Sequence, residues 1–191
     1  LGVRTVATSR NFTQGSLQQS SNSLDVAING NGFFEVQLPD GTIGYTRDGS
    51  FQLDSQGRLV TSGGLPVANG ITVPQGATSI SISESGVVSA TLAGNPQPQQ
   101  LGQLAMSSFI NAAGLQPVGQ NMYKESAASG APQQGQPGTN GLGVMRQGFL
   151  ETSNVNVVEE LVTMIQTQRA YEMNSKAIQT SDQMLAKLSQ L

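Results

Sequence analysis

The side chains of this sequence that could do chemistry are carboxylates, because its 191 residues include neither His nor Cys. Their absence excludes the Ser–His and Cys–His arrangements of nucleophilic catalysis and the common zinc sites. A pair of carboxylates could still supply the acid and the base of a glycosidase. The candidates are Asp25, Glu35, Asp40, Asp48, Asp54 and Glu84.

Most of these carboxylates lie where a turn uses them. Asp40, Asp48 and Glu84 belong to Gly-containing turns and Asp54 follows an expected strand, where short polar side chains favour local hydrogen bonds. The segment "DGSFQLDSQG" lacks oxygen ligands at the alternate positions of a calcium loop. "NGNGFF" has no following helix to bind phosphate and predicts a tight turn. We therefore expect no catalytic residue, no metal site and no cofactor.

The composition indicates a lean core with many turns. Charged residues make up 11% of the sequence, aromatic residues 5%, and Gly occurs 23 times. The formal net charge of -3 provides no basic surface, so neither a nucleic acid nor an anionic membrane is an expected partner. No apolar run approaches 18 residues, and we expect no membrane insertion. Because Leu1 is not a start methionine, we also expect residues upstream of it.

An eight-residue period indicates strands in the first half of the chain. Three units, "DGTIGYTR", "DGSFQLDS" and "QGRLVTSG", follow one another from residue 40 to residue 63. Each has an apolar fourth position, at Ile43, Phe51 and Leu59, and Tyr45 and Leu53 lie two residues further on. A turn every eight residues with inward side chains at spacing two predicts a β-meander with one buried face.

The remaining pattern predicts a mainly β body of short strands, meander-like or barrel-like, followed by one long C-terminal helix. We expect an extended linker segment at 1–23, a β domain at 24–150 and a C-terminal assembly helix at 151–191. The further strands are expected at 71–73, 79–83, 87–92, 101–109 and 142–150. The segment "GNPQPQQ" (94–100) is expected to be an exposed connector, and residues 126–141 a low-complexity loop.

The C-terminal segment carries an apolar stripe. Asn156 is a plausible N-cap, and no Gly or Pro occurs from residue 155 to residue 191, which would extend roughly 50 Å as a helix. The first three turns are apolar on most sides, and a seven-residue stripe follows. The residues that we predict to form an assembly interface are Val157, Leu161, Met164, Ile165, Ala170, Tyr171, Ala177, Ile178, Met184 and Leu185.

The stripe needs a surface to cover it. A sheet of strands about 17–20 Å long offers too little face for a helix of this length. A strict seven-residue repeat suits a second helix in a left-handed supercoil, and polar Thr167, Asn174 and Ser181 along the seam suit helix-to-helix registry. We therefore expect the covering partner to be an upstream helix or another copy of the protein, on which the helix packs in a coiled-coil-like layer.

Both ends of the sequence resemble a known family. The segment "TQGSLQQSSNSLDVAINGNGFFEVQLPDGTIGYTRDGSFQLDSQGRLVTSGG" (13–64) resembles the axial proteins of the bacterial flagellum, the rod and hook group. "LETSNVNVVEELVTMIQTQRAYEMNSKAIQTSDQML" (150–185) is similar to the C-terminal segment of that group, and most similar to its members of the distal rod. The middle of the chain carries no such motif.

The resemblance implies a non-enzymatic structural subunit, exported by the flagellar type III pathway and assembled helically into a tubular shaft that transmits torque across the periplasm. It implies that the C-terminal helix pairs with an N-terminal helix, which would precede Leu1. The implied partners are copies of the protein itself, proximal rod proteins, the hook protein, and the periplasmic and outer-membrane ring proteins. Two alternatives stay open: another axial subunit of the proximal rod or hook, and a secreted β-domain carbohydrate binder or hydrolase.

Overall fold

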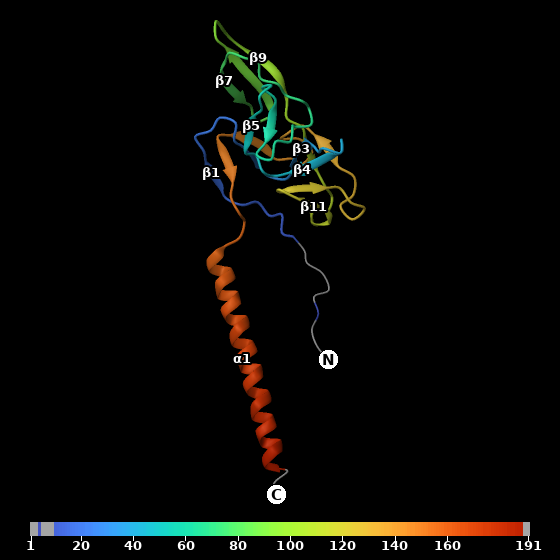
Figure 1. Cartoon of the computed structure of the whole chain (residues 1–191), viewed down its shortest axis with the longest axis vertical. Helices are drawn as coiled ribbons and strands as arrows, with labels where there is room; N and C mark the ends of the chain where they lie inside the picture. Colours follow the sequence, from blue (N-terminus) through green and yellow to red (C-terminus); the bar gives the residue numbers. More distant parts are fainter. Residues whose placement is uncertain (1–3, 5–9, 189–191) are drawn as a thin grey trace. The chain divides into compact units, whose positions relative to one another are not determined.

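The chain divides into two units, which are described separately. The computed structural model describes Arg4 and residues 10–188, with backbone only at positions 96, 186 and 188. The β unit is Leu1–Ser153 and the helical unit is Asn154–Leu191 (Figure 1). The expected mainly β body with one long C-terminal helix is confirmed. Positions 1–3 and 5–9 of the expected linker lie outside the described residues.

The strands of the β unit form five sheets within the described residues. The largest sheet has six strands in the spatial order β11 (Gln116–Gly119), β12 (Met122–Lys124), β4 (Ile43–Thr46), β3 (Phe33–Gln37), β10 (Met106–Ser108) and β13 (Gln133–Gly135). A three-stranded sheet, at one end of the β unit in Figure 1, contains β7 (Ala77–Ile82), β8 (Val87–Leu92) and β9 (Asn95–Gln103).

Three pairs of strands complete the unit. They are β1 (Leu17–Gln19) with β15 (Phe149–Glu151), β2 (Val26–Asn29) with β14 (Val144–Gln147), and β5 (Phe51–Leu53) with β6 (Leu59–Thr61). One short 3-10 helix, η1, spans Ala112–Gly114. No sheet of the described residues closes on itself, so the barrel-like form that we expected is wrong.

The chain changes sheets inside the eight-residue repeat, and the single meander that we expected does not form. β4 pairs with β3 and β12, whereas β5 pairs with β6. Between them, the Val26 amide donates to the Gly49 carbonyl over 3.0 Å, and a Cβ atom on Gly49 would lie 1.7 Å from the Val26 oxygen. The close approach of two backbones, which Gly permits, thus directs the chain onto β2 instead of into a hairpin between β4 and β5.

Burial within the repeat follows this change of sheet. Phe51, Leu59 and Tyr45 are buried as expected, but Ile43 and Leu53 are 40% and 39% exposed. The expectation of one common inward face is therefore wrong at these two positions. Because β4 and β5 belong to different sheets, equal spacing in the sequence does not give them the same buried face.

Elsewhere the strand predictions succeed where a turn bounds them. β8 has the expected bounds, and the turn before it is closed by the Gly86 amide on the Ser83 carbonyl at 2.9 Å. Three expectations are wrong. Residues 95–100 of the expected connector belong to β9, residues 71–73 make one isolated bridge instead of a strand, and β13 lies in the expected 126–141 loop. β9 is at the edge of its sheet, where Pro is tolerated in a strand.

The main core joins several of the sheets. Phe34 of β3 and Phe51 of β5 meet edge to face with ring centroids 5.1 Å apart. The buried members of this cluster are Val26, Ile28, Phe34, Phe51, Leu59, Val67, Ile71, Ile82, Val88, Leu104, Met106, Leu142 and Met145. The opposite face of β3 is buried too, because Phe33 packs with Tyr45 and Leu115 in a second cluster. β3 is therefore the central strand of the unit.

The helical unit contains α1 (Val157–Leu188). The predicted N-cap is confirmed: the Asn156 side-chain oxygen accepts the Val158 amide at 3.2 Å, and the Asn156 carbonyl accepts the Glu160 amide at 3.0 Å. The helix begins six residues after the expected boundary at 151, because Glu151 is the last residue of β15. No helix in the described part of the chain is both long and apolar enough to cross a membrane.

We predict that Phe51→Ala lowers the free energy of unfolding of the β unit by about 3–5 kcal/mol, because it removes a buried ring from the main core. Leu53→Ala, two residues away on the same strand, removes a half-exposed side chain and lowers it by about 1 kcal/mol or less. Urea unfolding measures both values. Equal losses for the two variants would contradict the burial described here.

A second prediction concerns pH. Burial, and to a smaller extent the charges of Glu35 and Glu125, raises the pKa of Tyr45 to about 12. The folded protein thus retains a proton that the unfolded chain releases near pH 10, so stability falls between about pH 10 and about pH 12. Tyr45→Phe removes this component of the loss. Urea unfolding at about pH 9 and about pH 11.5 tests it, and an identical loss in both proteins would contradict it.

Candidate assembly surface

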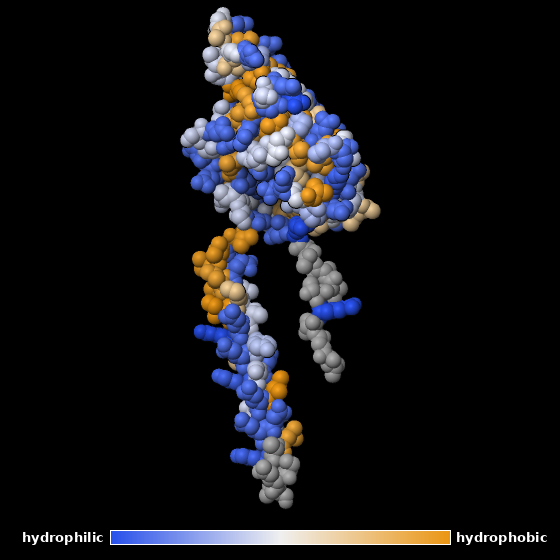
Figure 2. Space-filling model, in the orientation of Figure 1, coloured by the Kyte–Doolittle hydropathy of each residue, from blue (hydrophilic) through white to orange (hydrophobic). Residues whose placement is uncertain are grey.

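All ten side chains that we predicted at an assembly interface lie on α1 and are exposed in this chain. Leu161 and Ile165 in the first turns are each 47% exposed, and Tyr171 further along is 75% exposed. Figure 2 shows an apolar region at the first turns of α1 and smaller apolar spots toward its C-terminal end. Exposure alone does not identify what covers these side chains, so their role stays a prediction.

The stripe winds slowly around α1. Val157, Met164, Tyr171, Ile178 and Leu185 are seven residues apart, and a seven-residue step drifts by about 20° on a straight helix. Such a line of side chains faces a second helix along its length only if the two wind around each other with a left-handed twist. The geometry of α1 thus matches a helix-to-helix contact better than a flat surface.

The polar seam residue Thr167 does not need a partner outside the helix. Its hydroxyl donates to the Thr163 carbonyl one turn earlier, at 2.9 Å. A hydroxyl bonded in this way can be covered by another helix without losing its only hydrogen bond. This favours a role in close packing for Thr167, whereas the sequence had indicated that Thr167 sets the register between two helices.

The chain that leads into α1 leaves the β unit through a strand pair that sequence reasoning missed. β1 and β15 are antiparallel, with Leu17 opposite Glu151. Beyond this pair, the Thr152 amide donates to the Ser16 carbonyl at 2.8 Å. Part of the expected 1–23 linker is therefore fixed to the β unit. The three-residue length of both strands, and the two Gln residues of β1, gave no usable signal for this pairing.

An aromatic contact fixes the same segment further upstream. The Phe12 ring lies edge to face against Phe33, at 5.6 Å between centroids, and against Tyr123, at 5.2 Å. Phe12 was the one aromatic residue of the expected linker, and that was the signal that could have placed it on the β unit.

Five of the six carboxylates considered for catalysis bind other groups of the β unit. Asp40 pairs with Lys124 and accepts the Thr42 hydroxyl at 2.6 Å and the Thr42 amide at 3.0 Å, and these hydrogen bonds hold the pKa of Asp40 well below its usual range. Buried Glu35 accepts hydrogen bonds from Ser107 and Gln134. The others with described partners are Asp25 with Ser20 and Asn22, Asp48 with Ser50, and Asp54 with Arg58.

Two family models match the two parts of the chain. The model described as the flagellar hook protein FlgE/F/G D1 domain matches residues 27–90, which lie in the β unit. The model described as the flagellar basal body rod FlgEFG protein C-terminal matches residues 146–191, which include α1.

Known proteins named flagellar basal-body rod protein FlgG are similar over nearly the whole chain. The protein from Buchnera aphidicola of Acyrthosiphon pisum is 60% identical over 100% of this chain and 73% of its own length. The Borreliella burgdorferi protein is 53% identical over 96% and 70%, and the Bacillus subtilis protein 43% identical over 91% and 67%. Since the similarity covers the β unit and α1 alike, this chain belongs to the FlgE/F/G family of flagellar rod and hook proteins, a structural family of the basal body.

Proposed function

We propose that this chain is a structural subunit of the distal rod of the flagellar basal body. The observation that carries the proposal is the 60% identity, over the whole chain, to a protein named flagellar basal-body rod protein FlgG. A more distant relative, named FlgF, is 34% identical over 91% of the chain, so the similarity favours the distal rod over another axial position.

In this proposal the subunit works by binding and not by catalysis. Copies assemble helically, and torque passes through many repeated contacts from the motor to the hook. α1 supplies the contact, with the ten side chains from Val157 to Leu185 packed against helices of the same layer. The further partners are the proximal rod proteins, the hook protein and the periplasmic and outer-membrane rings.

The energetics favour assembly. A helix with the Ser, Thr and Asn content of α1 is marginal alone in water. Each large apolar side chain that is fully buried contributes about 1.5–3 kcal/mol before ordering entropy is subtracted. Five or six such side chains along α1 are enough to hold the helix once a neighbour covers them. Assembly would thus stabilise α1 and join the subunits at the same time.

We expect Tyr171→Asp and Ile178→Asp, each introduced into motile cells in place of the wild-type protein, to abolish swimming and rod assembly. Each places a charge in the proposed helix-to-helix contact, where burial without a partner costs several kcal/mol. Swimming-plate assays and electron microscopy of isolated basal bodies measure the effects. The β unit of both variants should unfold at the wild-type urea concentration, because neither side chain belongs to its core.

The matched control is Lys176→Asp, which introduces the same new residue. At about 100° per residue, position 176 lies about 140° and about 160° around α1 from positions 171 and 178. Its neighbours one turn away, at 172, 173, 179 and 180, lie outside the predicted interface. Swimming by the Lys176→Asp cells together with paralysis of the other two assigns the stripe to assembly. Normal swimming in all three variants would show that the stripe is not a contact.

If the chain were instead a hydrolase, it would release fragments from peptidoglycan, and the release would depend on the turn carboxylates. We expect the triple change of Asp40, Asp48 and Asp54 to Asn to leave the release of soluble fragments from purified peptidoglycan at the blank level, as in the unchanged protein. The three carboxylates bind their own turns and Lys124 or Arg58. Release by the unchanged protein that the triple variant loses would overturn the structural assignment.

A further inference from the structure

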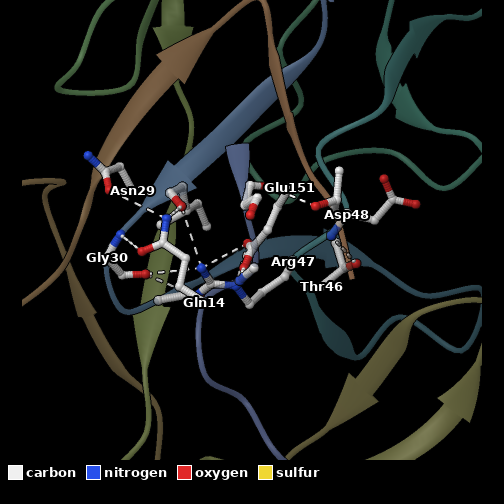
Figure 3. A network of polar contacts seen from close by, with 12 residues as sticks. Gln14, Asn29, Gly30, Thr46, Arg47, Asp48 and Glu151 are labelled. Atoms are coloured by element: carbon white, nitrogen blue, oxygen red, sulfur yellow. Dashed lines mark hydrogen bonds and ion pairs between the residues drawn. The ribbon is translucent and has the colours of Figure 1, made fainter. Parts of the chain in front are cut away.

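The side chain of Arg47 gathers contacts from segments far apart in the sequence (Figure 3). Its Nε and Nη2 atoms each lie 2.9 Å from Oε2 of Glu151. Its Nη1 atom donates to the carbonyls of Gly30 and Gly32, both at 3.0 Å, and Nη2 donates to Gly30 at 3.1 Å and Ile28 at 3.4 Å. All three nitrogens of the guanidinium are therefore bonded.

The turn that receives Arg47 is shaped by glycine. Gly30 and Gly32 have φ angles of 117° and 136°, which other residues rarely adopt, and a Cβ atom on Gly30 would lie 2.7 Å from the Gly143 Cα atom. This turn joins β2 to β3, both of which reach the main core. The "NGNGFF" segment thus forms the predicted tight turn, and its carbonyls form a receptor for a guanidinium.

Glu151 connects the same place to the N-terminal segment. Its Oε1 atom accepts the Gly15 amide at 2.9 Å, while Oε2 binds Arg47. Next to it, the Gln14 side chain accepts the Gly30 amide at 3.0 Å and donates to the Ile28 carbonyl at 3.3 Å. The side chains of Glu151 and Arg47 are only 12% and 16% exposed. Together they hold the residues before β1, and the last residue of β15, against the turn at Gly30.

The strand pair depends on these side chains. β1 and β15 form a two-stranded sheet with no third strand among the described residues, and such a ribbon is marginal by itself in water. Because the two strands are antiparallel, the chain enters β1 at the same end of the pair at which it leaves β15 toward α1. A pull on the chain after residue 152 acts on this end first.

We propose that Arg47 and Glu151 form a clasp that holds both terminal segments on the β unit and transfers load between the core and the chain entering α1. The load-bearing part rests on the proposed function as a rod subunit. Arg47 is suited to it because a guanidinium is a planar fork that binds a carboxylate with two nitrogens and still reaches several carbonyls, which the single ammonium of Lys does not.

The clasp itself is tested by amide hydrogen exchange of the full chain. We expect Arg47→Lys and Glu151→Gln each to speed exchange about tenfold or more at the Gly15, Ser20 and Thr152 amides. The amides of β3 and β8 in the core should keep their wild-type rates. Both changes are conservative in size, so the β unit should remain folded, and the core amides report whether it does.

The control is Arg58→Lys, the same substitution in the exposed ion pair of Arg58 with Asp54, whose side chains are 47% and 20% exposed. It should leave the Gly15, Ser20 and Thr152 amides unchanged. Unchanged exchange at these amides in both Arg47→Lys and Glu151→Gln overturns the clasp. Equal acceleration at the core amides overturns it too, because the pair would then support the whole unit and not this end.

The load-bearing part is tested in cells. We expect Arg47→Lys cells to assemble rods and to swim in dilute medium. As the viscosity is raised, the ratio of their swimming speed to the wild-type speed should fall by about half or more. For Arg58→Lys cells this ratio should not change. Wild-type behaviour of Arg47→Lys cells at every viscosity overturns this part. A failure of the rod assignment itself would appear elsewhere, as release of peptidoglycan fragments by the unchanged protein that the triple Asp-to-Asn variant loses, while the exchange result would stand.

Discussion

A helix that contains Ser, Thr, Asn and β-branched residues is marginal alone in water, and this constraint governs the whole protein. α1 has a good cap at Asn156 and no interrupting Gly or Pro, yet its apolar side chains are exposed in this chain. A globular protein would cover such side chains with its own core. The exposure of these side chains is what our proposal of an assembling rod subunit requires.

The β unit covers most of its large apolar side chains without a partner, because it has a core of its own. β3 is buried on both faces, with Phe34 in one cluster and Phe33 in another, and the edge-to-face contact of Phe34 with Phe51 ties two sheets together. The core is small for the length of the chain, as its low aromatic content requires, and polar turns occupy much of the rest. Three of the carboxylates that could have formed a catalytic pair, Asp40, Asp48 and Asp54, accept hydrogen bonds from their own turns.

Within the β unit, the last strand before α1 belongs to a short strand pair, which is held by polar contacts and not by the burial of apolar side chains. Arg47 and Glu151 are largely buried and form an ion pair. In addition, Glu151 accepts the Gly15 amide, and Arg47 donates to the Gly30 carbonyl. Burying a charge is unfavourable unless it is paired and hydrogen-bonded, and this pair meets both conditions. The result is a specific geometry at the place where the residues before β1 and the end of β15 are held on the β unit.

The sequence by itself determined the features that are local along the chain. The cap at Asn156, the bounds of β8, the turn at Gly86 and the stripe of α1 all follow from spacing or from a residue and its near neighbours. Only the tertiary structure decided which strands pair, and therefore that Ile43 and Leu53 face outward and that residues 95–100 belong to an edge strand. It also decided that Phe12 packs on Phe33 and that Glu151 binds both Gly15 and Arg47. The reason is physical: a period of two or seven residues is written in the chain, whereas a partner more than a hundred residues away, as Glu151 is for Arg47, is chosen by packing and by hydrogen bonds that no local pattern records.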